Sequence, residues 1–416
     1  MAKRNYALYS TNIIAILIYV VVFFNLKITV SEEIMFSTLD AGSYKDVQNW
    51  LEHGVDSENV STRPLLYPLL LMTTSKLGGV YGIWIVQVIF WLLSINFTFM
   101  TINYITKNNL LSFIGAFFFM SNLSLIALTL HALTEVTTVF LLSMMLFLLA
   151  RKIEEYRSLR FFHICLFFMV LLTILKPVFY IPLLSLLFIV LPLFYLKKYL
   201  KYPLNILILL LIILPVIVQI TIIKTKYGEA KVSLISSKTL SNYLVSQGME
   251  KIESISFESA VKKSNSLSQK QQIYYIKNHL FLYSYLFKGN IVHNIRGVSF
   301  FLLYPDGYEK YRLSLFMKHY NNVMLILHCI FLIFIFPLIF IFIKSRNFSI
   351  LIFLVFFSIL EFYYIFVTGI SFWQGDRLTL PAIAIWSCIY PIILFYYLKI
   401  LYPTSNITNC KIVSKS

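Results

Sequence analysis

The sequence predicts an all-α protein that crosses a membrane about ten times. Of its 416 residues, 59% are hydrophobic, and the mean hydropathy is +0.79, whereas soluble domains are about 45–50% apolar. Runs such as 12–30 and 205–223 reach the roughly 20 residues that a helix needs to cross a bilayer. Because these runs are continuous and the bilayer offers the backbone no hydrogen bonds, each is expected to be a helix.

The basic residues fit a membrane protein better than a nucleic-acid-binding protein. The net charge is +17, from 35 Lys and Arg against 18 Asp and Glu. In a soluble chain this excess would suggest nucleic acid, but here the basic residues flank apolar runs, as in membrane proteins generally. We therefore expect membrane lipid, and no nucleic acid, around them. The predicted spans are 11–30, 80–104, 109–129, 132–150, 161–175, 178–196, 203–223, 320–343, 347–369 and 379–399.

The distribution of Lys and Arg predicts that both chain ends are cytoplasmic. With the N-terminus inside, the short cytoplasmic segments carry basic groups such as Lys197 and Lys198, and the short outer segments carry few. Short cytoplasmic loops are enriched in Lys and Arg. Two longer polar segments, 31–63 and 224–319, then lie outside the membrane.

The two outer segments carry opposite charge. Segment 31–63 has seven carboxylates and two cations, and segment 224–319 has fourteen cations and six carboxylates. The aromatic stretches 273–290 and 298–311 in the second segment are too short to span, so we expect interfacial or re-entrant helices there. The chain is accordingly divided into an N-terminal membrane module (1–223), a large outer loop (224–319) and C-terminal membrane helices with a cytoplasmic tail (320–416).

Several common chemistries lack their sequence signals. The chain has no G-x-G-x-x-G motif, no P-loop and no D-x-D, and its four cysteines have no metal-type spacing. No predicted cytoplasmic loop between spans exceeds about ten residues, too few for a nucleotide-binding domain. Nucleotide-dependent chemistry inside the cell is therefore disfavoured.

Acidic residues beside the first span are the first candidates for chemistry. Asp40 follows that span and precedes the Pro-containing stretch RPLLYP. A carboxylate held at the membrane surface can act as a general base on a hydroxyl. Several such acids can instead hold a divalent cation, or simply be solvated loop charges.

Further charged residues lie at predicted outer ends of spans. Glu135 begins one span, Lys176 lies in an outer turn, and Asp376 and Arg377 precede the last span. An acid at membrane depth is a functional candidate, with pairing to a nearby cation as the alternative. The outer cations, Arg63 included, can bind a phosphate or extend to the interface.

These stretches resemble a known superfamily. An outer loop with the pattern D-x-x-x-Y (Asp40, Tyr44) followed by RPLLYP, then HALTE around Glu135, LKPVF around Lys176, and GDRLTLP with its R-x-x-L-P pattern, resembles the membrane-embedded GT-C glycosyltransferases. Within that superfamily, the length and the two outer loops most resemble the phage- and prophage-encoded serotype-converting O-antigen glucosyltransferases. One departure is that Ala41 follows Asp40, where many members have an adjacent carboxylate pair, so the identity of the catalytic carboxylate stays open.

The resemblance implies a function and a location. It implies an inverting transferase in the bacterial inner membrane that moves a hexose, expected to be glucose, from undecaprenyl phosphate to O-antigen or another surface glycan. Asp40 and Glu135 would be catalytic, and a divalent cation could assist. The residues expected to bind substrate are Tyr44, Arg63, Lys176, Asp376 and Arg377. The alternatives are a glycan polymerase or ligase and a lipid-linked sugar transporter.

Overall fold

The computed structural model describes residues 2–26, 29–299, 312–344, 347–372 and 374–402. Within these residues every regular element is a helix and no strand occurs, so the predicted all-α membrane fold is confirmed. Eight helices are long and apolar enough to cross a membrane.

The eight candidate spans follow the long apolar runs. They are α1 (Ala2–Leu26), α4 (Leu66–Thr106), α7 (Thr134–Arg151), the continuous run Pro177–Lys201, α11 (Pro203–Tyr227), α17 (Arg312–Lys344), α18 (Phe348–Val367) with its 3-10 extension to Ile370, and α19 (Ile383–Leu401) with the preceding 3-10 turn. Two further apolar helices, α5 (Asn109–Met120) and α8 (Leu159–Leu175), are shorter, at 12 and 17 residues. The ten predicted spans therefore correspond to eight long helices and two short ones.

The prediction of one helix over 109–129 is wrong. The chain leaves α5 after Met120 and starts a second helix, α6 (Leu123–Leu128). Asn122 causes this interruption, because its side chain accepts a hydrogen bond from the backbone N–H of Leu125 and so caps a new helix.

Helix α4 has a break at the point where the sequence predicts a span to begin. Gly78 and Gly79 leave helical geometry, and Gly79 has φ of +60°, which glycine adopts without steric cost. The preceding part of α4, from Leu66, is thus a separate helical arm, and the predicted span near Val80 starts directly after the break.

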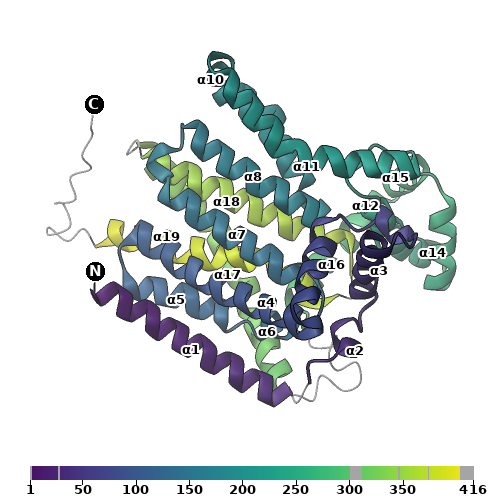
Figure 1. Ribbon diagram of the computed structural model, residues 1–416, viewed down its shortest axis with the longest axis horizontal. Helices are drawn as coiled ribbons and strands as arrows, with labels where there is room; N and C mark the ends of the chain where they lie inside the picture. Colours follow the sequence, from purple (N-terminus) through teal and green to yellow (C-terminus); the bar gives the residue numbers. More distant parts are fainter. Residues whose placement is uncertain (1, 27–28, 300–311, 345–346, 373, 403–416) are drawn as a thin grey trace.

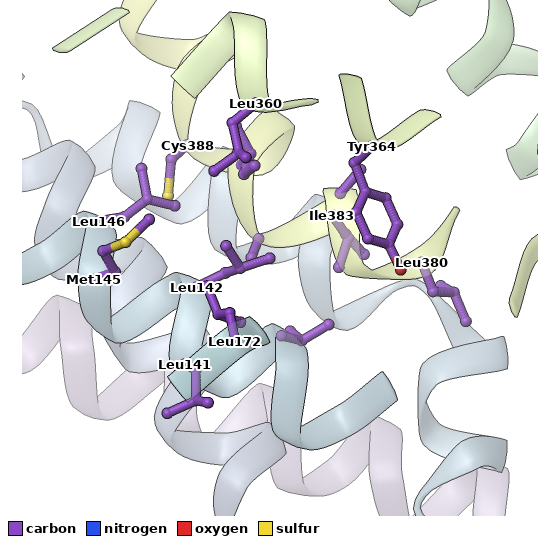
Figure 2. Packing of buried hydrophobic residues seen from close by; sticks show 14 of the residues in the cluster. Leu141, Leu142, Met145, Leu146, Leu172, Leu360, Tyr364, Leu380, Ile383 and Cys388 are labelled. Atoms are coloured by element: carbon purple, nitrogen blue, oxygen red, sulfur yellow. The ribbon is translucent and has the colours of Figure 1, made fainter. Parts of the chain in front are cut away.

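Helix α7 is at the centre of the bundle. In the most apolar stretch of α7, 72% of the residues are buried, compared with 17% in α11, whose leucines such as Leu207 and Leu211 face outward. Figure 2 shows Leu142 of α7 among residues of α8, α18 and α19. The residues that begin α7 therefore lie deep in the protein.

Most of the helices outside the spans gather at one end of the bundle. The start of α1 and the end of α19 lie at the opposite end from α3 (Leu39–His53), α12 (Ile235–Thr239) and α14 (Phe257–Ser266) (Figure 1). Further helices outside the spans are α2 (Glu32–Met35), α13 (Ser246–Glu253), α15 (Gln269–Asn278) and α16 (Leu280–Arg296). The aromatic stretch predicted to be interfacial forms α15 and α16, whereas 300–311 of the second stretch lie outside the described residues.

Candidate functional site

Asp40 lies in the first turn of α3. The helix starts there because Thr38 caps it, accepting the backbone N–H of Ala41 on its side chain at 3.1 Å. An acid in this turn also interacts favourably with the positive end of the helix dipole. The side chain of Asp40 is 23% exposed.

Arg63 is fixed beside Asp40 by three contacts. Its Nη2 donates to Oδ1 of Asp40, and its Nε donates to Oγ of Ser43 at 2.7 Å. Its guanidinium lies 4.9 Å from the centroid of the Tyr44 ring, a cation–π arrangement. Tyr44 in turn packs edge-on against Tyr67 at 5.0 Å, so the predicted residues Asp40, Tyr44 and Arg63 lie together.

Arg377 joins this group to the start of α7. It lies in the 3-10 turn Gly375–Leu378, where its Nη2 donates to Oδ2 of Asp40 and its Nε donates to Oε1 of Glu135 at 3.0 Å. Because Arg377 is only 9% exposed, both bonds are shielded from solvent.

Lys176 completes the cluster. It follows α8 and places its Nζ 3.2 Å from Oε1 of Glu135 and 5.8 Å from the centroid of the Tyr364 ring. Glu135 itself is 1% exposed. The five side chains therefore form one continuous chain of ion pairs, called the ion-pair chain below: Arg63, Asp40, Arg377, Glu135 and Lys176.

The ion-pair chain has an unbalanced charge. Three cations and two carboxylates leave one net positive charge in a largely buried place. Burial alone would raise the pKa of Asp40, but the charges of Arg377 and Arg63 outweigh it and hold this pKa well below its usual range. Burial alone would lower the pKa of Arg377, but Glu135 and Asp40 raise it above its usual value. Asp40 is therefore ionised and Arg377 charged throughout the physiological range.

Asp376 points away from the ion-pair chain. Its Oδ1 accepts the backbone N–H of Ser299 at 2.7 Å and the Ser299 hydroxyl, and its Oδ2 accepts Nδ2 of Asn321 at 3.1 Å. Asn321 also donates to the carbonyl of Gly297. These bonds fix the turn that carries Arg377. The structure thus brings six of the seven predicted residues together, whereas the side chain of Asp376 lies outside the ion-pair chain.

His131 is a buried residue near the site that the sequence prediction left out. Its Nδ1 lies 3.4 Å from Oγ of Ser37. Burial, assisted by the charge of Arg377, lowers the pKa of His131 to about 4, so it is neutral at pH 7. In the sequence it lies four residues before Glu135, which indicates either a contact to a sugar or phosphate or a structural role.

An open pocket of about 540 Å³ lies over the N-terminal turn of α3. Gly42 lines it, and a Cβ built on Gly42 would meet no atom within 4 Å. The other lining residues are Phe36, Ser37, Thr38, Leu39, Asp40, Ser43, Asp46, Asn59 and Arg63. A ligand in this pocket would reach one end of the ion-pair chain.

The described residues contain no group of three or more His, Cys, Asp and Glu side chains arranged to hold a metal ion. The two acids of the ion-pair chain each face basic side chains instead of one another. The site therefore presents cations, and its chemistry suits an anionic ligand.

Comparisons with known proteins give no relative. No protein-family model matches the chain, and neither a curated protein nor a solved structure matches it.

Proposed function

We propose that the chain is an integral membrane glycosyltransferase that moves a hexose from a polyprenyl phosphate to a hydroxyl of a surface glycan. The observation that carries this proposal is the ion-pair chain, whose net positive charge adjoins a pocket at one end of a helix bundle. A lipid-linked phosphate sugar would bring one anionic group to such a place. The resemblance to the GT-C glycosyltransferases, and to the O-antigen glucosyltransferases among them, supports the same reading.

In the proposed reaction the acceptor hydroxyl attacks the anomeric carbon of the sugar. A bond forms between that carbon and the acceptor oxygen, and the bond to the phosphate oxygen breaks with its electron pair on the phosphate. Arg63, Arg377 and Lys176 would stabilise the negative charge that grows on the leaving phosphate. Asp40 would take the proton of the hydroxyl, and a single displacement inverts the anomeric centre.

The proposed location is the bacterial inner membrane, with both chain ends cytoplasmic and the ion-pair chain on the outer side. Expression of the chain in a host that makes undecaprenyl-phosphate glucose tests the proposal. We expect a gain of one hexose mass per O-antigen repeat by mass spectrometry. Asp40→Asn should abolish the gain, and Asp56→Asn, which changes an exposed acid of the same segment, should keep it. A longer or shorter glycan with unchanged repeats would instead indicate a polymerase or ligase.

A second candidate, a lipid-linked sugar transporter, has one observation in its favour. Within the bundle, Tyr390 donates to Oε1 of the fully buried Glu361 at 2.6 Å, and Nδ1 of His328 lies 3.2 Å from the same oxygen. Ionisable groups at membrane depth are characteristic of transport pathways. Movement of lipid-linked sugar across proteoliposome membranes, without a glycan product, would favour this candidate.

A further inference from the structure

We infer that the carboxylate of Asp40 occupies the place of a ligand phosphate between Arg63 and Arg377, and that a bound phosphate displaces it. This inference rests on the proposed function, because it takes the ligand to be a polyprenyl phosphate. Displacement changes the role of Asp40 from a counter-ion into a base that can accept a proton.

The pairing of Asp40 motivates the inference. Each of its two carboxylate oxygens accepts from a different guanidinium, Oδ1 from Arg63 and Oδ2 from Arg377. Among the described residues the carboxylate has no other hydrogen-bond partner. A carboxylate held in this way is a poor base, so the arrangement in this structure does not suit proton transfer.

The two arginines do not depend on Asp40 for their positions. Arg63 is also bonded to Ser43 and lies against the Tyr44 ring. Arg377 is also bonded to Glu135 through its Nε. If the carboxylate moves away, both guanidiniums keep a second anchor and can present their N–H groups to another anion. Two phosphate oxygens can accept from two guanidiniums just as the two carboxylate oxygens do.

The exposure of these side chains also favours the displacement of Asp40 by a phosphate. Asp40 and Arg63 line the pocket, whereas Arg377 does not. The side chain of Asp40 is 23% exposed, compared with 15% for Arg63 and 9% for Arg377. A ligand that enters from the pocket therefore meets the carboxylate before it reaches Arg377.

The charges balance at each step of the proposed reaction. The empty site carries one net positive charge, from three cations and two acids. A sugar–phosphate–lipid donor is a phosphodiester with one negative charge, so the donor-bound site is neutral. After transfer, the lipid phosphate is a monoester with a charge of about −2, while Asp40 holds the proton and is uncharged. The total charge of the site is then again about zero, from three cations, one ionised acid (Glu135) and this phosphate.

The displacement also imposes an order on binding. Until the phosphate arrives, Asp40 is paired and cannot activate a hydroxyl. The donor must therefore bind before proton transfer to Asp40 can begin, and a hydroxyl, including that of water, is not activated in the empty site.

Removal of the Asp40 carboxylate should strengthen the binding of a phosphate. The test uses the purified full-length protein in lipid nanodiscs, with farnesyl phosphate as a short polyprenyl phosphate probe and farnesol as its uncharged control. Asp40→Asn removes the internal competitor, so we expect it to bind farnesyl phosphate about tenfold more tightly than wild type, equivalent to about 1.4 kcal/mol. Farnesol binding should not change. Asp40→Ser, a second variant without the carboxylate, should show the same gain, and Asp56→Asn should match wild type.

Each outcome of the binding experiment is informative. Weaker or unchanged farnesyl phosphate binding by Asp40→Asn and Asp40→Ser, with measurable wild-type binding, would overturn the inference and leave the proposed function standing. An absence of farnesyl phosphate binding by wild type and both variants would count against the polyprenyl phosphate ligand itself. A gain with farnesol as well would show that the change opens the pocket without freeing an anion site, and would also overturn the inference.

Discussion

The link between Glu135 and Lys176 gives a quantitative test of the ion-pair chain. Glu135 is 1% exposed and accepts from both Lys176 and Arg377 at Oε1. Glu135→Gln keeps the size of the side chain but removes its charge, which leaves Lys176 without its carboxylate partner. Breaking a buried ion pair costs about 3–5 kcal/mol, and because Lys176 is 18% exposed we expect the lower end, about 3 kcal/mol.

A second substitution then restores part of this stability. Lys176→Met in the Glu135→Gln background removes the unpaired charge, so the double variant should be more stable than Glu135→Gln alone. We expect a coupling energy of about 1–2 kcal/mol, within the range of about 0.5–3 kcal/mol for residues in contact. The assay is reversible unfolding of wild type, both single variants and the double variant in mixed micelles. If the two single effects add to within about 0.5 kcal/mol, the two side chains do not interact as the structure indicates and the reasoning fails.

Three further predictions concern the surroundings of the ion-pair chain. Gly42→Leu should fill the pocket and reduce the proposed hexose transfer at least about tenfold. It should not reduce stability, since a glycine within a helix destabilises it by about 0.5–1 kcal/mol relative to alanine. Gly289→Leu, at an equally open helical position, should leave transfer unchanged, and equal effects of the two variants would contradict the pocket assignment. His131→Asn should remove a loss of stability that the wild type shows in acid. The imidazole takes up a proton near pH 6.5 in the unfolded state and only near pH 4 in the folded state, so the free energy of unfolding of the wild type falls as pH falls through this window, by up to about 3 kcal/mol. The same dependence of stability on pH in both proteins would refute this. Arg377→Gln and Asp376→Asn should both weaken farnesyl phosphate binding, because Asp376 positions the turn that carries the arginine. Unchanged binding in Asp376→Asn would refute that role.

The helices, and the gathering of the charged residues at one end of the bundle, could be predicted from sequence. Long apolar runs leave few alternatives to helices. The alternation of basic segments predicts that Asp40, Glu135, Lys176 and Arg377 lie on the same side of the membrane. The structure brings these four residues together from distant parts of the chain. Their roles in a reaction stay predictions.

The pairings within the site could not be predicted, since they depend on side-chain direction. Asp376 and Arg377 are adjacent in sequence, but the tight 3-10 turn sends one side chain to Ser299 and the other to Asp40 and Glu135. No periodicity in the sequence distinguishes these directions. The interruption at Asn122 was missed for a related reason, because a single capping side chain decided it against an otherwise apolar run.

The arrangement of acids and cations also has a physical rationale that extends beyond any one residue. Three cations held close together in a poorly hydrated site would repel one another and lose their hydration. Asp40 and Glu135 stabilise them by alternating with them along the ion-pair chain. Because the ion-pair chain has three cations and only two acids, it keeps one net positive charge that can attract an anionic ligand. Of the two acids, only Asp40 lines the pocket, and its carboxylate accepts hydrogen bonds from the two arginines alone among the described residues. A ligand can therefore replace Asp40, while Glu135 keeps Arg377 and Lys176 in place.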